Sequence, residues 1–310
     1  MEIWDVIIIG AGSAGLAASI YTVRSGLRTL VFDEKLAGGN IGDAPKVENY
    51  PGFAEISGRE LSEKMISQCQ KFGVIMRELE MVEKLRLDGK IKTVITPDAV
   101  YQANAVLFTT GAHHKVLGVR GEKEFQGRGV SYCGICDGPF FKGKNIAVVG
   151  GGNSACITSL YLSGIAKQVT IIHRRDAFRA EHKLALDVAL KNNVDVLWNT
   201  EVEEIKGDRQ VRSVALRNGV TGEKTEVAVD AVFVQVGEVP NSAVAKAADV
   251  EVDAAGYIKV NMRQETNFLG VYAAGDVTTH PVKQVGTAVG QGITAALQIY
   301  SYIQGICKVT

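Results

Sequence analysis

Two glycine-rich turns, each directly after a short apolar run, constrain the fold of this chain more than any other feature. Gly10-x-Gly12-x-x-Gly15 follows residues 5–9, and Gly150-x-Gly152-x-x-Ala155 follows residues 145–149. Short runs rich in β-branched residues are typical of parallel strands buried on both faces, and glycines at this spacing let the chain turn closely around a pyrophosphate into a helix. The sequence therefore predicts two dinucleotide-binding βαβ units.

The remaining apolar runs predict how the two units are joined. At 310 residues the chain is long enough for two domains. Residues 105–111 and 231–237 are similar runs, each suited to close one unit, and residues 270–276 with a final helix return the chain to the first unit. We expect an α/β fold with two Rossmann-like domains, the second inserted in the first: residues 1–113 and 241–310 form one domain, and residues 114–240 form the other.

Charge and composition argue against several classes of partner. The chain has 34 basic and 34 acidic residues, which does not favour a nucleic-acid partner. No apolar run reaches the roughly 18 residues of a membrane span. The acidic start also differs from a secretory signal. We therefore expect a soluble, cytoplasmic protein with no membrane or nucleic-acid partner.

Asp33 supports the first glycine turn as a nucleotide site. It ends the next predicted strand, residues 28–33. An acid at this place accepts hydrogen bonds from a ribose of the dinucleotide, whose pyrophosphate lies at the helix N-terminus. Glycines that serve only close packing are the alternative, and the strand context favours the nucleotide site.

Basic residues take the place of that acid in the second unit. The strand after the second glycine turn ends in His173-Arg174-Arg175, and Arg179 follows. A carboxylate about 4 Å from a ribose 2′-phosphate would cost on the order of 4 kcal/mol at an effective dielectric constant of about 20, whereas guanidinium groups donate charge-assisted hydrogen bonds to phosphate. The second turn is therefore predicted to prefer NADP(H) to NAD(H). Solvated surface arginines are the alternative.

A pair of cysteines, Cys133 and Cys136, lies just before the second glycine turn. Such Cys-x-x-Cys turns form a reducible disulfide and lower a thiol pKa, and the neighbouring Asp137 is placed to carry a proton. The five cysteines include no second closely spaced pair, so we expect no disulfide framework. A zinc site needs about four ligands, and this pair alone does not supply them. We predict a redox-active dithiol and no metal; an inert buried pair is the alternative.

Taken in order, these motifs resemble the low-molecular-weight thioredoxin reductases over essentially the whole chain. Besides the two glycine turns, the resemblance rests on Cys133 to Gly138, on residues 173–180 and on Tyr272 to Asp276. It implies a homodimer in which the first domain binds FAD and the inserted domain binds NADPH. It also implies that Cys136 faces the flavin and receives electrons, that Cys133 attacks the disulfide of a thioredoxin, and that Asp137 acts as the acid.

The resemblance assigns a set of residues to each cofactor. The set expected around FAD is Gly10, Gly12, Ser13, Ala14, Gly15, Asp33, Glu34, Gly38, Gly39, Asn40, Asn49, Ala112, Gly275, Asp276, Lys283, Gln284 and Val285. The set expected around NADPH is Gly150, Gly152, Asn153, Ser154, Ala155, His173, Arg174, Arg175 and Arg179. The chain departs from the family at Lys283, where arginine is common, at Asn40, where glutamine is common, and at Ile157-Thr158, where acidic residues are common.

Three functions are compatible with this order of motifs. The first is a thioredoxin-disulfide reductase that passes electrons from NADPH through FAD and the dithiol. The second is a related flavoprotein dithiol oxidase, or a reductase of another thiol-disulfide carrier such as a glutaredoxin-like protein. The third is a flavin-bearing binding protein without turnover, which would not need the cysteine pair.

Overall fold

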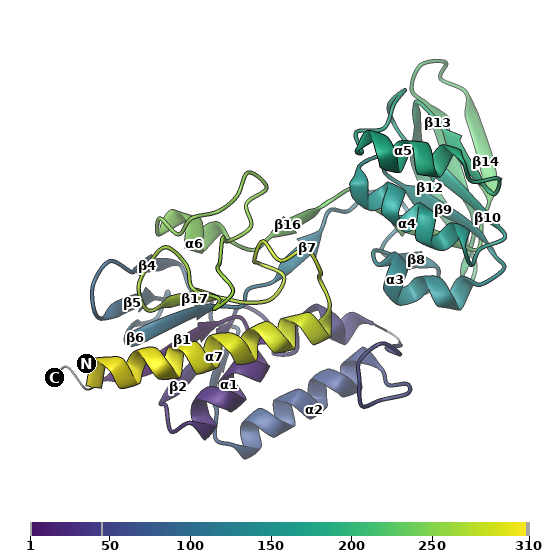
Figure 1. The fold of residues 1–310 in the computed structure, drawn as a ribbon. Helices are drawn as coiled ribbons and strands as arrows, with labels where there is room; N and C mark the ends of the chain where they lie inside the picture. The colour runs from purple at the N-terminus through teal and green to yellow at the C-terminus, as the bar shows by residue number, and fades with distance from the viewer. Residues whose placement is uncertain (1, 45, 308–310) are drawn as a thin grey trace. The chain divides into compact units, whose positions relative to one another are not determined.

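The structure, a computed structural model, describes residues 2–44 and 46–307 and divides into two compact units (Figure 1). The first unit is the chain up to His113 and from Val239 onward, and the second unit is His114–Glu238. The sequence pattern places Val239 and Pro240 in the inserted domain, whereas they lie in the first unit. They belong to β16 (Glu238–Pro240), which pairs with β7 (Ala112–His114), so the two chain crossings form one two-stranded ribbon.

The first unit is built on a sheet that has seven strands within the described residues, in the order β3-β2-β1-β6-β5-β4, with β17 also paired to β6. Strands β1, β2, β3, β6 and β17 run parallel, and β5 and β4 extend the sheet in antiparallel fashion. Besides β7 and β16, the elements are β1 (Ile3–Ile9), α1 (Ser13–Arg24), β2 (Thr29–Asp33), η1 (Gly39–Asp43), α2 (Gly58–Lys71), β3 (Ile75–Glu78), β4 (Lys84–Arg86), β5 (Lys92–Ile95), β6 (Val100–Phe108), α6 (Ala243–Ala247), β17 (Val271–Ala273) and α7 (Val285–Cys307).

Alternation along β1 explains the two layers that cover this sheet. Val6 and Ile8 face the side on which α1, α2 and α7 pack, whereas Ile7 and Ile9 face the side covered by α6 and the loops after it. α7 lies along α1 (Figure 1), and a Cβ on Gly292 would lie 2.2 Å from the Ala14 carbonyl oxygen. The two helices can therefore approach this closely only because α7 has a glycine at that position.

The second unit combines a parallel sheet with a separate antiparallel one. The parallel sheet has the order β11-β10-β9-β15-β8, and β12-β13-β14 form the other sheet. Helices α4 and α5 pack on one face of the parallel sheet, and the antiparallel sheet covers the other face. The elements are β8 (Val130–Ser131), α3 (Gly134–Asp137), η2 (Gly138–Phe141), β9 (Asn145–Val149), α4 (Asn153–Ser163), β10 (Gln168–Ile172), α5 (His182–Ala189), β11 (Val194–Leu197), β12 (Thr200–Gly207), β13 (Val211–Asn218), β14 (Lys224–Ala228) and β15 (Ala231–Val234).

The predicted α/β fold with parallel sheets is confirmed. The strands predicted at residues 5–9, 28–33 and 145–149 correspond to β1, β2 and β9. The sequence pattern does not predict the antiparallel strands β12 to β14. In β12 and β13 exposed residues are interspersed with buried ones, and β14 is mostly exposed, so the three strands lack the continuous apolar run that marks a strand buried on both faces.

The packing of Gly15 against the preceding turn leads to a prediction about stability. A Cβ at Gly15 would lie 1.9 Å from the Gly10 carbonyl oxygen. We expect Gly15→Ala to lower the midpoint of thermal unfolding by several degrees, because overpacking costs about 1–3 kcal/mol and each kcal/mol is worth about 2–4 °C in a domain of this size. Gly290→Ala is the control, because a Cβ there meets nothing within 4 Å and the position is exposed in α7. Equal midpoints for the two variants would contradict the packing argument.

Candidate functional site

The first glycine turn leaves a helix start open to an anion. Gly10 has a φ of 108°, and a Cβ there would lie 2.3 Å from the Thr109 carbonyl oxygen. α1 begins after Gly12, and no side chain among the described residues caps its first turn. A Cβ on Gly39 would lie 2.9 Å from the Gly12 Cα, so a second bare backbone segment meets the turn. Bare amides at a helix N-terminus favour a phosphate, and the turn fits the pyrophosphate of a dinucleotide.

Asp33 lies beside this turn at the end of β2. Its Oδ2 accepts the Ala11 backbone N–H at 2.7 Å, and its Oδ1 accepts the Lys35 backbone N–H at 2.8 Å. Burial raises the pKa of Asp33, and these two hydrogen bonds oppose the rise. A carboxylate oxygen has two lone pairs, so each oxygen can also accept a ribose hydroxyl. Glu34, the next residue, is exposed.

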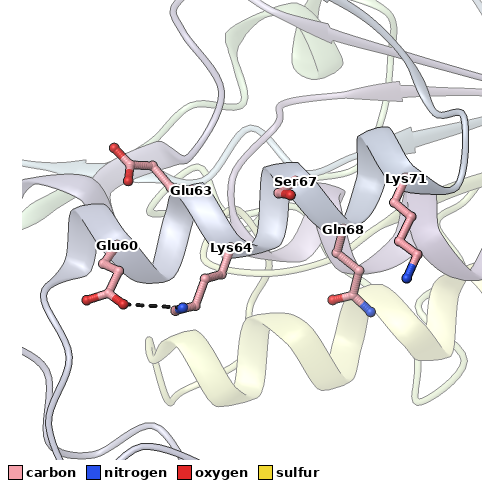
Figure 2. Close-up of a pocket in the computed structure, with 6 residues that line it drawn as sticks. All are labelled: Glu60, Glu63, Lys64, Ser67, Gln68 and Lys71. Carbon is pink, nitrogen blue, oxygen red and sulfur yellow. Dashed lines mark ion pairs between the residues drawn. The ribbon is translucent and has the colours of Figure 1, made fainter.

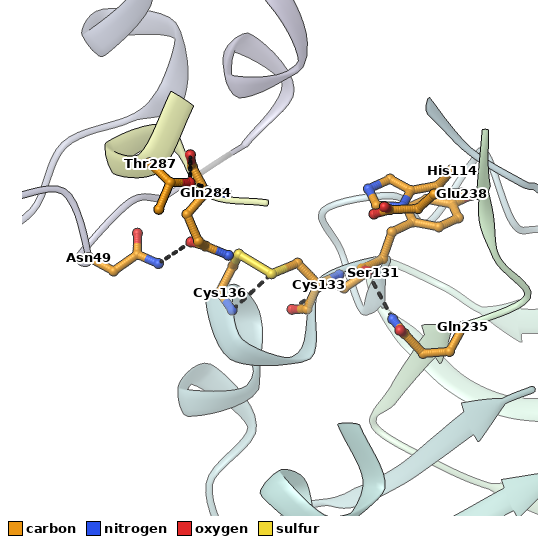
Figure 3. The surroundings of a disulfide bond; sticks show 10 residues. Asn49, His114, Ser131, Cys133, Cys136, Gln235, Glu238, Gln284 and Thr287 are labelled. Carbon is orange, nitrogen blue, oxygen red and sulfur yellow. Dashed lines mark hydrogen bonds and ion pairs between the residues drawn. A yellow bond between two sulfur atoms is a disulfide. The ribbon is translucent and has the colours of Figure 1, made fainter. Parts of the chain in front are cut away.

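Other residues expected around FAD hydrogen-bond to one another within the first unit. Asn40 Nδ2 donates to the Ala112 carbonyl oxygen at 2.7 Å. Asn49 Nδ2 donates to Gln284 Oε1 at 3.2 Å, as Figure 3 shows. Loops that are far apart in the sequence are thereby brought together around polar side chains.

Lys283 stabilises the segment between β17 and α7. Its Nζ donates to the carbonyl oxygens of Asp276 at 3.0 Å and Thr278 at 2.6 Å, and it lies 4.3 Å from the centroid of the Tyr257 ring. Lysine thus performs a backbone-ordering role at the position where arginine is common in the family that the motifs resemble. The helix start without a side-chain cap, the Asp33 carboxylate and these ordered loops fit a flavin dinucleotide in the first unit.

The second unit contains a cleft of about 640 Å³. It is lined by the second glycine turn, by the segment that carries the arginines, by the start of β12 and by the residues after β15. Gly150 has a φ of 148°, and a Cβ there would lie 2.2 Å from the Gln235 carbonyl oxygen. α4 begins after Gly152 with no side-chain cap within the described part of the chain. The second turn therefore repeats the anion-binding arrangement of the first.

Arg174, Arg175 and Arg179 line this cleft, and their side chains are exposed. In the described ranges, none of the three forms an ion pair with a carboxylate. The Arg179 backbone N–H donates to the Gly151 carbonyl oxygen at 2.7 Å, and the Asn199 N–H donates to that of Arg175 at 3.0 Å. The backbone of the arginine segment is thus hydrogen-bonded to the glycine turn, and the guanidinium groups are available for a phosphate.

His173 packs beneath the second glycine turn. A Cβ on Gly151 would lie 2.3 Å from the imidazole, and the ring also contacts Phe178 and Trp198, with ring centroids 6.1 Å apart in each pair. Burial lowers the pKa of His173, and the nearby arginines lower it further, while a hydrogen bond to Ala177 opposes the shift. A neutral imidazole therefore shapes the turn without adding charge to the cleft.

Cys133 and Cys136 form a disulfide with a Cα–Cα distance of 5.3 Å (Figure 3). Cys133 immediately precedes α3, and its Sγ accepts the Cys136 backbone N–H at 3.2 Å. A donated N–H stabilises negative charge, which favours the thiolate of Cys133 after reduction. A Cβ on Gly134 would lie 2.6 Å from Thr158 Cγ2, so the dithiol turn rests on α4.

Asp137 is half-buried, and burial raises its pKa, while a hydrogen bond from Ser131 lowers it. The Ser131 Oγ also accepts the Cys133 backbone N–H at 3.0 Å. A carboxyl group with a raised pKa keeps its proton at higher pH than an ordinary aspartate, which suits a group that protonates a leaving thiolate. One serine thus contacts both the first cysteine and the neighbouring acid.

Sequence reasoning missed three residues that complete these sites. Ser131 is one. Gln291 of α7 is buried, and its Oε1 accepts the Gly275 N–H at 2.6 Å. Glu201 lines the cleft and pairs with Arg217 at 3.5 Å. A single serine, glutamine or glutamate has no characteristic spacing, and only the position of Ser131 two residues before Cys133 offered a signal.

A second hollow follows the exposed face of α2 (Figure 2). Only polar and charged side chains of that helix line it, among them Glu60 and Lys64, which form an ion pair at 3.3 Å. It contains neither a glycine turn nor a thiol, so we assign it no function.

Metal-binding groups and membrane spans are both absent from the part of the chain that the structure describes. Within these ranges, no three or more His, Cys, Asp or Glu side chains are grouped so as to hold a metal ion. No described helix is at once long enough and apolar enough to cross a bilayer.

Two nucleotide-binding turns and a reducible disulfide on one chain define a class of protein, the oxidoreductases that move electrons between dinucleotides and a disulfide. Residues 4–292 match the pyridine nucleotide-disulphide oxidoreductase family, and the chain belongs to this family.

Several relatives of this chain are thioredoxin reductases. The chain is 44% identical over 305 residues to the thioredoxin reductase of Bacillus subtilis (strain 168), covering 98% of this chain and 96% of the relative. A solved thioredoxin reductase from Streptococcus pyogenes MGAS5005 is 39% identical, with a TM-score of 0.94 and coverage of 98% and 99%. The thioredoxin reductase of Lactococcus lactis, solved in its FR conformation, is 38% identical, with a TM-score of 0.66 and coverage of 97% and 99%. The resemblance seen in the motifs is confirmed, and the cofactors of this kind of enzyme are FAD and NADPH, as expected.

Removing the Ser131 hydroxyl should shift the titration of Asp137. The hydrogen bond from Ser131 lowers the pKa of Asp137, so Ser131→Ala should raise it and move that ionisation upward in the pH profile of disulfide reduction. Ser159→Ala is the control, because the buried Ser159 hydroxyl has no hydrogen-bond partner among the described residues. An unchanged profile in Ser131→Ala would contradict the assigned contact.

Proposed function

We propose that this chain is a thioredoxin-disulfide reductase, which takes electrons from NADPH and passes them through FAD and the Cys133/Cys136 dithiol to a thioredoxin. The observation that carries the proposal is the Cys133–Cys136 disulfide, in which the Cys133 sulfur accepts a backbone N–H. The same unit holds a cleft lined by three arginines that lack carboxylate partners in the described ranges. The names of the relatives support thioredoxin as the partner.

In this proposal the first unit holds FAD. The amides of Ser13 to Gly15 at the start of α1 bind the pyrophosphate, and Asp33 accepts a ribose hydroxyl. Gly38, Gly39, Asn40, Asn49, Ala112 and the segments around Asp276 and Lys283 complete the site. When bound, FAD accepts a hydride from NADPH and supplies two electrons to the disulfide.

The second unit holds NADPH. Its pyrophosphate binds the amides of residues 153–155 at the start of α4, and the 2′-phosphate binds Arg174, Arg175 and Arg179. The buried His173 keeps the glycine turn in shape. NADH lacks the phosphate, so it would leave the three guanidinium groups without their ligand.

The dithiol carries the electrons to the protein partner. Two electrons and one proton convert the disulfide into the Cys133 thiolate and the Cys136 thiol, and Asp137 protonates the partner thiolate that leaves when the mixed disulfide forms. The Cys133 thiolate, stabilised by the Cys136 N–H, then attacks the partner disulfide and forms a mixed disulfide as one partner thiolate leaves. Attack by Cys136 on the Cys133 sulfur releases the reduced partner and restores the Cys133–Cys136 disulfide.

We further propose that the enzyme is a cytoplasmic homodimer. Cys69 and Cys156 are free and buried, and a dithiol that cycles through its reduced form suits a reducing compartment. The dimer follows from the family resemblance, and light scattering in solution tests it.

Exchange of one thiol separates the two half-reactions. Cys133→Ser should still let NADPH bleach the flavin, because hydride transfer precedes use of the dithiol, and should abolish reduction of thioredoxin. In the unmodified enzyme, reoxidation of the bleached flavin only on adding thioredoxin supports the reductase. Rapid reoxidation by oxygen, or only by a glutaredoxin-like carrier, would identify a dithiol oxidase or another reductase. Full turnover in Cys133→Ser would refute the role of the thiol.

The arginines of the cleft should decide the choice of nucleotide. Arg174→Ala or Arg179→Ala should raise the KM for NADPH by roughly tenfold or more, because a hydrogen bond to a charged group is worth about 1.5–3 kcal/mol. The KM for NADH should hardly change. Arg209→Ala is the control, because Arg209 is exposed in the same unit and lies outside the cleft. Equal use of NADH and NADPH by the unmodified protein would overturn the 2′-phosphate site.

A further inference from the structure

Tyr132, the residue immediately before Cys133, makes three separate contacts within the second unit. Its hydroxyl donates to Glu122 Oε1 at 2.9 Å. Its carbonyl oxygen accepts a hydrogen bond from Gln235 Nε2 at 2.8 Å. Its ring stacks on His114, with ring centroids 5.1 Å apart. Both ends of this residue are therefore held, although no motif draws attention to it.

Glu122 connects the Tyr132 hydroxyl to one wall of the nucleotide cleft. The side chain is only 4% exposed, and its two oxygens accept the backbone N–H groups of Leu117 and Gly118, both at 2.8 Å. A buried carboxylate is costly unless it is hydrogen-bonded, so these donors and the phenol hold it in one position. Burial and the bond to Glu122 raise the pKa of Tyr132, which keeps the phenol protonated as a donor. Leu117 itself lines the cleft.

Gln235 connects the Tyr132 carbonyl to the second glycine turn. Its backbone N–H donates to the Val149 carbonyl oxygen at 2.8 Å, and its own carbonyl oxygen packs against Gly150. Gln235 lines the same cleft, and Figure 3 shows its side chain directed at the segment that carries Ser131 and Cys133. Gln235, a residue that lines the cleft, thus hydrogen-bonds to Tyr132, the residue before the reactive Cys133.

We propose that Tyr132 is a positioning residue that couples the nucleotide cleft to Cys133, so that a nucleotide bound in the cleft changes the reactivity of the Cys133 thiol. The inference rests on the proposed function only for the presence of the nucleotide site. Gln235, which holds the Tyr132 carbonyl, lines the cleft. Glu122, which holds the Tyr132 hydroxyl, is hydrogen-bonded to Leu117, and Leu117 lines the cleft. A nucleotide that moves or stiffens Leu117 or Gln235 therefore acts on the peptide between Tyr132 and Cys133.

The test measures the Cys133 thiol directly in the flavin-loaded enzyme. Cys136→Ser leaves Cys133 unable to form the disulfide, and mass spectrometry follows its alkylation by iodoacetamide across pH. The rate is compared with and without saturating adenosine 2′,5′-bisphosphate, which carries the 2′-phosphate and cannot reduce a flavin. We expect the bound nucleotide to change the rate by about two- to tenfold, the range of one hydrogen bond. Adding Tyr132→Phe removes the hydrogen bond to Glu122 and should weaken this change, and adding Gln235→Met as well should abolish it.

Two further variants make the outcome decisive. Tyr161→Phe is the matched control, since Tyr161 lies on α4 of the same unit and its hydroxyl makes no hydrogen bond within the described residues, and it should keep the effect of the nucleotide. Gln235→Met removes the hydrogen bond to the Tyr132 carbonyl and should weaken the effect of the nucleotide on the alkylation rate. If circular dichroism shows that Tyr132→Phe is unfolded, Gln235→Met alone tests the coupling.

Calorimetry of the bisphosphate distinguishes the two ways in which the idea can fail. If the bisphosphate does not bind, the nucleotide site of the proposed function is wrong and the coupling falls with it. If it binds and the alkylation rate is unchanged, or if the change persists in full when Tyr132→Phe and Gln235→Met are combined, the nucleotide site stands and the coupling through Tyr132 is wrong.

Discussion

In each unit, the glycine directly after the strand that leads into the glycine turn lies against a carbonyl oxygen just beyond the end of a neighbouring strand. The Cβ positions of Gly10 and Gly150 would come within 2.3 Å of the Thr109 oxygen and 2.2 Å of the Gln235 oxygen, so a side chain cannot be accommodated at either place. This approach sets where the chain turns into α1 and α4, both of which start without a side-chain cap in the described ranges. The two helix starts proposed to bind phosphate depend on it.

The charged residues near each turn distinguish the two nucleotide sites. In the first unit a partly buried carboxylate, Asp33, is ordered by two backbone N–H groups and presents acceptors for a ribose. In the second unit, guanidinium groups without carboxylate partners in the described ranges face a cleft beside the buried, neutral His173. Opposite charge at equivalent positions suits a neutral ribose diol in one unit and a 2′-phosphate in the other.

The dithiol depends on its surroundings in the second unit more than on its own four residues. Ser131 contacts both the Cys133 amide and Asp137, and Thr158 of α4 lies against Gly134. Glu122 and Gln235 hold Tyr132, the residue immediately before Cys133. The chemistry at sulfur is therefore set by groups that are themselves hydrogen-bonded or buried, an arrangement that keeps a reactive group in one geometry.

By itself, the sequence determined the α/β fold, the strands β1, β2 and β9, the family and its two cofactors, because glycine spacing, apolar runs and the cysteine pair are signals carried by neighbouring residues. The full sets of cofactor contacts remain predictions. Only the tertiary structure decided that Val239 and Pro240 belong to the first unit, that Gln291 binds the Gly275 amide, and that Glu122 reaches Tyr132. Strand pairing and burial bring these residues together, and a contact made by folding leaves no pattern in the local sequence.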